Sequence, residues 1–138
     1  MSNMVTLVDT GFLVALFAAN DKHHNKAKQF LADNTQLEMH CIWPVIVETC
    51  FFLNHDGKQA LLQWLSLGAV VMHDIAPQDI PLISKTLHDY KNLEPDFTDA
   101  VLVTMANLYK IKKILTVDVR DFSVYRFKDG SAFERLWI

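Results

Sequence analysis

Four acidic residues stand in stretches of the sequence that are otherwise apolar. Asp9 and Asp118 each directly follow a short apolar run, and Glu48 and Asp99 lie within apolar segments of helical length. An ionised carboxylate in apolar surroundings is costly unless it is paired or bound to a metal, and converging carboxylates raise one another's pKa. A hard divalent cation such as Mg²⁺ or Mn²⁺ compensates this repulsion, whereas zinc would call for closely spaced His or Cys. The residues therefore predict a metal site that could activate water and stabilise a phosphodiester leaving group.

An alternation of short strands and helices would bring these acids together. We predict strands at residues 5–8, 37–42, 69–72, 113–117 and, as an edge strand, 133–138, and helices at 12–19, 24–34, 45–53, 60–67, 77–90 and 97–110. Strands this short and apolar are typical of a mostly parallel sheet that helices cover on both faces, an α/β fold of three layers. In such sheets, functional groups gather at the carboxyl ends of the strands, so Asp9 and Asp118 should meet at one edge.

Each acid also has a purely structural explanation. Asp9 and Asp118 could be helix caps or turn residues, because aspartate is favoured at both places. Glu48 could pair with a basic residue or lie on an exposed stripe of its helix. Asp96 could cap the last long helix, with Asp99 in its favourable first turn. Only the combination of all the acids favours a metal site over these alternatives.

Size and composition restrict the classes of protein to consider. A chain of 138 residues has room for one hydrophobic core, so we predict a single domain over residues 1–138. The net charge of −3 argues against a protein that coats nucleic acid non-specifically. Two cysteines are too few for a disulfide scaffold, and no apolar run is long enough to span a bilayer. We therefore expect a cytoplasmic protein without a membrane association.

Four segments resemble the acidic motifs of PIN domains, in the same order and at similar spacing over almost the whole chain. They are residues 8–16 (VDTGFLVAL), 47–49 (VET), 96–100 (DFTDA) and 115–122 (LTVDVRDF). The chain is most similar to the small single-domain prokaryotic members, which include VapC-type toxins. This resemblance implies a three-layer α/β/α fold with a central, mostly parallel sheet. It also implies a Mg²⁺- or Mn²⁺-dependent endoribonuclease, an RNA substrate, a small antitoxin as partner and a homodimer.

The resemblance assigns roles to individual residues. The acids that match the catalytic and metal-binding positions of the family are Asp9, Glu48, Asp99 and Asp118, and Asp96 and Asp121 match further positions that are often acidic. The residues that we expect near the substrate are Thr10, Thr116 and Arg120. His24 and Ala27 match a common His-x-x-Ala pair, to which we give a structural role. The sequence departs from the family at Trp43-Pro44, where small hydroxyl residues often precede the glutamate.

Other functions fit the sequence less well. A phosphorelay receiver would need two adjacent acids after the first strand, but Val8 precedes Asp9. A phosphatase with a nucleophilic aspartate would need Asp-x-Asp there, and Gly11 occupies the third position. A catalytically silent PIN-like module that binds RNA or a protein stays open as the alternative. We further expect the aromatic side chains Trp43, Phe51, Phe52 and Trp64 to belong to the core, since such residues are more often buried than used to stack bases.

Overall fold

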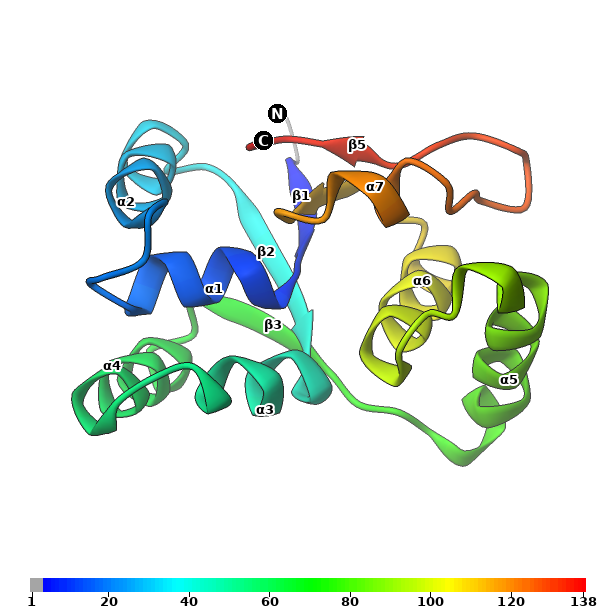
Figure 1. The fold of residues 1–138 in the computed structure, drawn as a ribbon, viewed down its shortest axis with the longest axis horizontal. Helices are drawn as coiled ribbons and strands as arrows, with labels where there is room; N and C mark the ends of the chain where they lie inside the picture. Colours follow the sequence, from blue (N-terminus) through cyan, green and yellow to red (C-terminus); the bar gives the residue numbers. More distant parts are fainter. Residues whose placement is uncertain (1–3) are drawn as a thin grey trace.

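The computed structural model describes residues 4–138, which form a five-stranded sheet (Figure 1). The strands lie in the order β3-β2-β1-β4-β5, and every neighbouring pair is parallel. Their bounds are Val5–Val8 for β1, Glu38–Ile42 for β2, Val70–His73 for β3, Lys113–Leu115 for β4 and Glu134–Arg135 for β5. The expected parallel sheet is confirmed.

Helices cover both faces of this sheet. They are α1 (Thr10–Phe17), α2 (His24–Asp33), α3 (Trp43–Phe51), α4 (His55–Ser66), α5 (Ile80–Asp89), α6 (Phe97–Tyr109) and α7 (Val119–Phe122), with 3₁₀ turns at Pro77–Asp79 and Lys91–Leu93. The crossover between two parallel strands is right-handed. Its helices therefore lie on one face of the sheet when the next strand is added in one direction and on the opposite face when it is added in the other. Figure 1 shows the result, with α1 to α4 on one side of the sheet and α5 and α6 on the other. The predicted three-layer α/β/α fold is therefore confirmed.

The strand order reverses between β1 and β4, and in open α/β sheets such a reversal leaves a crevice outside the carboxyl ends of the two strands. From β1 the chain continues to β2 on one side, and it later returns to place β4 on the other side. The two strands are joined up to their carboxyl ends, where the Asp9 amide donates to the Leu115 carbonyl at 2.9 Å. Ligands of open α/β sheets bind where the strand order reverses in this way. The crevice is therefore the first place to look for a site.

The core explains why α6 is so apolar. Seven consecutive residues of this helix, 100–106, are buried between the sheet and α5. On the opposite face, Phe12 of α1 is fully buried and meets the Trp137 ring edge-on at 4.9 Å between centroids. The His24 ring contacts the Ala15 carbonyl through Nδ1 at 2.8 Å, and Ala27 is buried, as expected for a structural pair.

The expectation that Trp43, Phe51 and Phe52 belong to the core is wrong. Trp43, Val47 and Phe51 are 46, 56 and 77% exposed, and they follow one another at four-residue spacing on one face of the helix. Phe52, just after the helix, is 66% exposed. Only Trp64 of the four expected core aromatics packs on the core, edge-on against a phenyl ring of α1. The opposite face of α3 packs on α1 and α6, and no element of residues 4–138 covers its outer face.

Some boundaries also differ from those expected. β5 spans only Glu134–Arg135, and its neighbour in the sheet, β4, is itself three residues long. The expected helix at 77–90 is divided into a 3₁₀ turn and α5, where Pro81 stands in the first turn because it has no backbone N–H to donate. The short helix α7 was not predicted. The longest helix in the described part of the chain, α6, has 13 residues, and none there is both long and apolar enough to cross a bilayer.

Candidate metal centre

Asp9 lies at the carboxyl end of β1 and caps α1. Its side chain is almost fully buried, and each oxygen accepts one hydrogen bond: Oδ1 from the Thr10 amide and Oδ2 from the Thr116 hydroxyl, both at 2.8 Å. The Thr116 oxygen in turn accepts from the Asp118 amide at 2.9 Å. One threonine thus connects the acids that follow β1 and β4.

Glu48 is held from two sides by hydroxyl groups. The Thr10 hydroxyl donates to Oε1 at 2.9 Å, and the Thr98 hydroxyl donates to Oε2 at 2.6 Å. These threonines begin α1 and α6, on opposite sides of the sheet. The glutamate is therefore directed toward the crevice between the two helix N-termini.

Three further carboxylates form the tightest cluster. Asp99, Asp118 and Asp121 each offer one oxygen such that all three oxygens lie within 4.8 Å of one another. Asp118 caps α7 by accepting from the Asp121 amide at 3.0 Å, and Asp96 caps α6 by accepting from the Asp99 amide at 2.8 Å. The caps orient the backbone of the second acid of each pair and leave its own carboxylate free to face the cluster.

Crowding of like charges perturbs the acids. Burial, and then the charges of Asp118 and Glu48, raise the pKa of Asp9 to about 6 against two opposing hydrogen bonds. Burial, followed by the charges of Asp9, Asp96 and Asp118, raises the pKa of Asp99 to about 8. Asp118 contributes to the raised pKa of both groups, and Asp9 contributes to that of Asp99. The acids from β1, α6 and the loop after β4 are therefore close enough to interact electrostatically. In the described chain, the ion pairs of these acids are limited to exposed Arg120, whose Nε lies 3.8 Å from Asp121 Oδ1.

A divalent cation fits this set of donors. The converging atoms are carboxylate oxygens, the donors that Mg²⁺ and Mn²⁺ prefer. Burial, together with the negative charge of neighbouring acids, raises the pKa of Asp9 and Asp99, and a cation would offset both effects. The residues that could hold an ion are the acids that converge here, Asp9, Glu48, Asp99, Asp118 and Asp121, of which the last two and Asp99 have oxygens within 4.8 Å of one another. Asp96 is exposed and already serves as a helix cap.

Two side chains that the sequence did not point to support the acids. The Tyr125 hydroxyl lies 3.3 Å from Asp99 Oδ2 and donates to it. Burial and then the facing Asp99 raise the pKa of Tyr125 well above its usual range, so the phenol keeps its proton. The second side chain is that of Thr98, whose hydroxyl donates to Glu48. The sequence feature that could have indicated a role for Thr98 is its position beside Asp99 in the first turn of a capped helix. Nothing in the sequence pointed to Tyr125.

The other expected substrate residues have mixed surroundings. The hydroxyls of Thr10 and Thr116 hold Glu48 and Asp9, and their contact with a substrate stays a prediction. Arg120 is 83% exposed and lies at the rim beside Asp121, where it could reach a phosphate. Next to the acids, a pocket of about 480 Å³ is lined by Thr10, Gly11, Val117 and the exposed ring of Phe52, among others. The crevice acids are not among its lining residues, but Thr10 and Val117 are the chain neighbours of Asp9 and Asp118, so the pocket adjoins the crevice.

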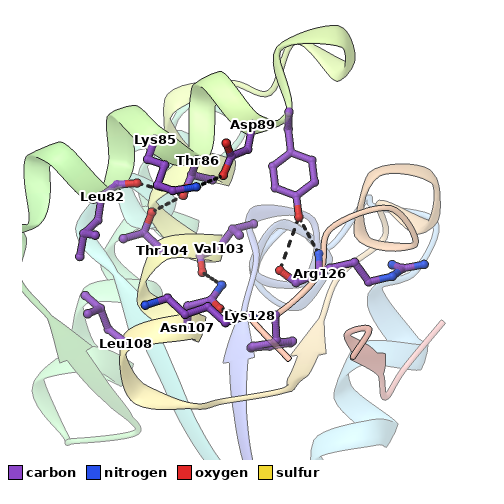
Figure 2. A pocket seen from close by; sticks show the side chains of 12 residues that line it. Leu82, Lys85, Thr86, Asp89, Val103, Thr104, Asn107, Leu108, Arg126 and Lys128 are labelled. Atoms are coloured by element: carbon purple, nitrogen blue, oxygen red, sulfur yellow. Dashed lines mark hydrogen bonds and ion pairs between the residues drawn. The ribbon is translucent and has the colours of Figure 1, made fainter. Parts of the chain in front are cut away.

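A second pocket, of about 280 Å³, lies away from the acids between α5, α6 and the segment 126–128 (Figure 2). Its polar groups are largely satisfied within the chain: Lys85 pairs with Asp89 at 2.6 Å, and the hydroxyls of Thr86 and Thr104 meet at 3.0 Å. The Tyr90 hydroxyl accepts from the Arg126 amide at 2.8 Å. This bond anchors the segment next to Tyr125, which supports Asp99.

Gly11 allows the loop after β4 to approach α1. A Cβ at this position would overlap the Cγ2 methyl of Val117 and would lie 3.3 Å from Val117 Cβ. We predict that Gly11→Ala destabilises the fold by about 1–3 kcal/mol through overpacking. Val117→Ala should relieve most of that cost in the double variant, since it removes the overlapping methyl. Urea unfolding of the four proteins of this mutant cycle measures the coupling, and strictly additive effects would contradict the contact.

The raised pKa values predict a loss of stability at higher pH when divalent ions are chelated. Because Asp9 and Asp99 have a higher pKa in the folded chain than the ordinary aspartate value of 3.8, the folded state binds more protons than the unfolded state above that pH. Their contribution is complete below this value and is lost as the pH rises through about 6 for Asp9 and about 8 for Asp99. We expect the Tm in chelator to fall over this window, and Asp99→Asn to reduce the fall below about pH 6 and to remove most of it above that pH. A wild-type Tm that is constant or rises there would refute the assignment.

Comparisons with known proteins agree with this architecture. The family model described as PIN domain matches residues 6–128. The chain is 25% identical over 132 residues to Ribonuclease VapC26 of Mycobacterium tuberculosis, covering 92% of this chain and 96% of the relative. The crystal structure of Mycobacterium tuberculosis VapC20, described as a sarcin–ricin loop cleaving toxin, is similar with a TM-score of 0.73 and 23% identity, over 84% of this chain and 91% of that one. A match that runs from β1 to the segment beyond α7 includes every strand that carries an acid of the crevice, and the chain belongs to the PIN domain family.

Proposed function

We propose that this chain is an endoribonuclease that hydrolyses RNA phosphodiester bonds with the aid of Mg²⁺ or Mn²⁺. The observation that carries the proposal is the convergence of carboxylates at the crevice: Asp118 offers an oxygen close to those of Asp99 and Asp121, and its charge adds to burial in raising the pKa of Asp9 and Asp99. The metal-holding acids would be Asp9, Glu48, Asp99 and Asp118, with Asp121 beside them and Asp96 in a supporting role as a cap.

The chain's own residues provide three functions in this proposal. The carboxylates of Asp9 and Asp99 hold the ion, which, when bound, lowers the pKa of water and neutralises charge on the phosphodiester. Glu48, fixed through both oxygens by Thr10 and Thr98, orients the attacking water and can accept its proton at a carboxylate oxygen. Arg120, at the exposed rim, would contact a phosphate of the bound strand.

The names of similar proteins favour RNA as the substrate. VapC26 is named a ribonuclease, and VapC20 is described as a toxin that cleaves the sarcin–ricin loop. We therefore propose that this chain is the toxin of a toxin–antitoxin pair, neutralised by a small antitoxin protein and active in the cytoplasm. A short reading frame next to its gene would encode that antitoxin, and growth arrest on expression, relieved by an Asp9 variant, would show toxicity.

The proposal predicts the effect of removing single carboxylates. Asp9→Asn and Asp99→Asn keep the size of the side chain but remove a metal-binding charge, so we expect each to lower Mg²⁺- or Mn²⁺-dependent RNA cleavage by at least about 100-fold. Cleavage of a fluorescent RNA measures the rate, and circular dichroism checks the fold. Asp33→Asn, at the exposed end of α2, is the matched control and should cleave at the wild-type rate.

Two results would count against this assignment. Undiminished cleavage by both folded variants would remove Asp9 and Asp99 from the site. Calorimetry that finds no saturable Mg²⁺ or Mn²⁺ binding to the wild-type protein would instead favour the alternative, a silent module that binds RNA or a protein.

The exposed apolar stripe of α3 supports a homodimer. Trp43, Val47 and Phe51 lie on one face of the helix, and large exposed apolar patches usually mark interaction surfaces. The stripe contains an aromatic residue at each end, a composition enriched in interfaces. We propose that two copies of the chain pack through this face of α3.

A charge within the stripe should therefore separate the dimer. Phe51→Glu places a carboxylate at a position that is 77% exposed in one chain, so the monomer should fold as before and the dimer should be lost. Leu67→Glu, at a position 75% exposed just after α4, is the matched control and should remain dimeric. Light scattering coupled to gel filtration gives the mass of each protein. A monomeric wild type, or a Phe51→Glu variant that is still a dimer, would exclude this interface.

A further inference from the structure

Two histidines and a glutamate form a chain of contacts at the other side of the sheet from β4. His40 of β2 and His73 of β3 meet through Nδ1 and Nε2 at 2.7 Å. The second nitrogen of His40, Nε2, lies 2.6 Å from Glu38 Oε2. These residues are distinct from the acids of the crevice, and the proposed function does not use them.

The two imidazole rings lie edge to edge. Their planes are inclined by only 22°, and their centroids are 4.9 Å apart. This separation is close to the 2.7 Å between the nitrogens plus the distance from each nitrogen to its own centroid, so the contact lies nearly in the plane of both rings. Each of the two nitrogens therefore directs its in-plane lone pair or proton at the other, which is the direction in which an imidazole binds a metal.

Glu38 selects the state of His40 that could act as a ligand. A carboxylate can only accept, so His40 Nε2 carries the proton of that contact. In the neutral ring the facing atom, Nδ1, then has a free lone pair. A carboxylate that accepts from the far nitrogen of a metal-binding histidine is the usual second partner of such ligands.

His73 is also suitably placed. Its ring packs on the Tyr109 ring at 4.3 Å between centroids, which fixes its orientation on the edge strand of the sheet. It is half-buried rather than enclosed, so an ion can reach it from solvent. When its proton moves from Nε2 to Nδ1 by exchange with water, the two facing nitrogens are both free and the charge of the ring is unchanged.

We propose that His40 Nδ1 and His73 Nε2 bind a divalent cation that prefers nitrogen ligands, with Zn²⁺ as the representative ion and Glu38 as the residue that orients His40. Water would complete the coordination. Imidazole nitrogens suit Zn²⁺, Cu²⁺ and Ni²⁺ rather than Mg²⁺, so this site and the carboxylate crevice select different metals.

The required movement is small. Zn–N bonds of about 2.0–2.1 Å at a tetrahedral angle place two ligand nitrogens about 3.3 Å apart. The rings would have to separate by about 0.6 Å from their present 2.7 Å, which a change in the two side-chain torsions can supply. Because β2 and β3 are already neighbours, the ion would join two strands of the same sheet.

The experiment is a titration of chelator-treated, untagged protein with Zn²⁺, followed by calorimetry. The Asp99→Asn variant serves as the background, because it weakens Zn²⁺ binding in the crevice. We expect one bound ion in this background, and at least a tenfold loss of affinity in His73→Gln. His88→Gln, which changes an exposed histidine of α5, is the matched control and should bind as before.

A second measurement identifies the ligands and the role of Glu38. With one equivalent of Cu²⁺, the electron paramagnetic resonance spectrum should show coupling to two imidazole nitrogens, reduced to one or none by His73→Gln. Glu38→Gln still offers an oxygen to His40 and should keep most of the affinity, whereas Glu38→Ala should lose about tenfold. Equal Zn²⁺ affinity with and without His73, or a copper spectrum that His73→Gln leaves unchanged, would overturn the proposal. Neither result depends on RNA cleavage, so the proposed ribonuclease can fail independently of this site.

Discussion

Repulsion among carboxylates is the constraint that shapes the crevice. Burial and the charges of neighbouring acids raise the pKa of both Asp9 and Asp99. The free energy that it costs to ionise them has to be offset in the folded chain. Helix N-termini supply part of the compensation: Asp9 begins α1, Asp118 begins α7, and each accepts a backbone N–H. A cation among the carboxylates would supply the rest, which makes metal binding and the stability of this region two aspects of one balance.

Threonine hydroxyls turn the separate acids into one arrangement. Thr116 connects Asp9 with the backbone of Asp118, while Thr10 and Thr98 hold Glu48 from the two faces of the sheet. The bonds to Glu48 and to the Asp9 carboxylate join residues 38 to 107 positions apart in the sequence, so the position of each of these acids depends on how distant elements pack. The predicted place of Thr10 and Thr116 near the substrate is compatible with these bonds, because a hydroxyl that fixes an acid of the crevice lies next to the space that a substrate would occupy.

Part of this arrangement could be predicted from the sequence because it follows from strand ends. Asp9 and Asp118 come directly after apolar runs, and parallel strands bring their carboxyl ends to one edge. Tyr125 could not be predicted, since its contact with Asp99 depends on the irregular segment that Tyr90 anchors. The four residues of α7 are too few to show helical periodicity. For α3, the composition predicted apolar side chains but could not show that Phe51 stays uncovered by any element of the described residues.

The exposed face of α3 connects assembly with the site. Phe51 and Val47 lie on its outer face, and Glu48 is the next residue after Val47, one hundred degrees around the helix and hydrogen-bonded to α1 and α6. A second copy packed on the outer face would restrict the same helix that the threonines restrict from inside. Because Glu48 is held by two threonine hydroxyls, any contact that fixes α3 also helps to fix the orientation of its carboxylate. An interface at this face would therefore add to the order of the crevice without contributing a residue to it.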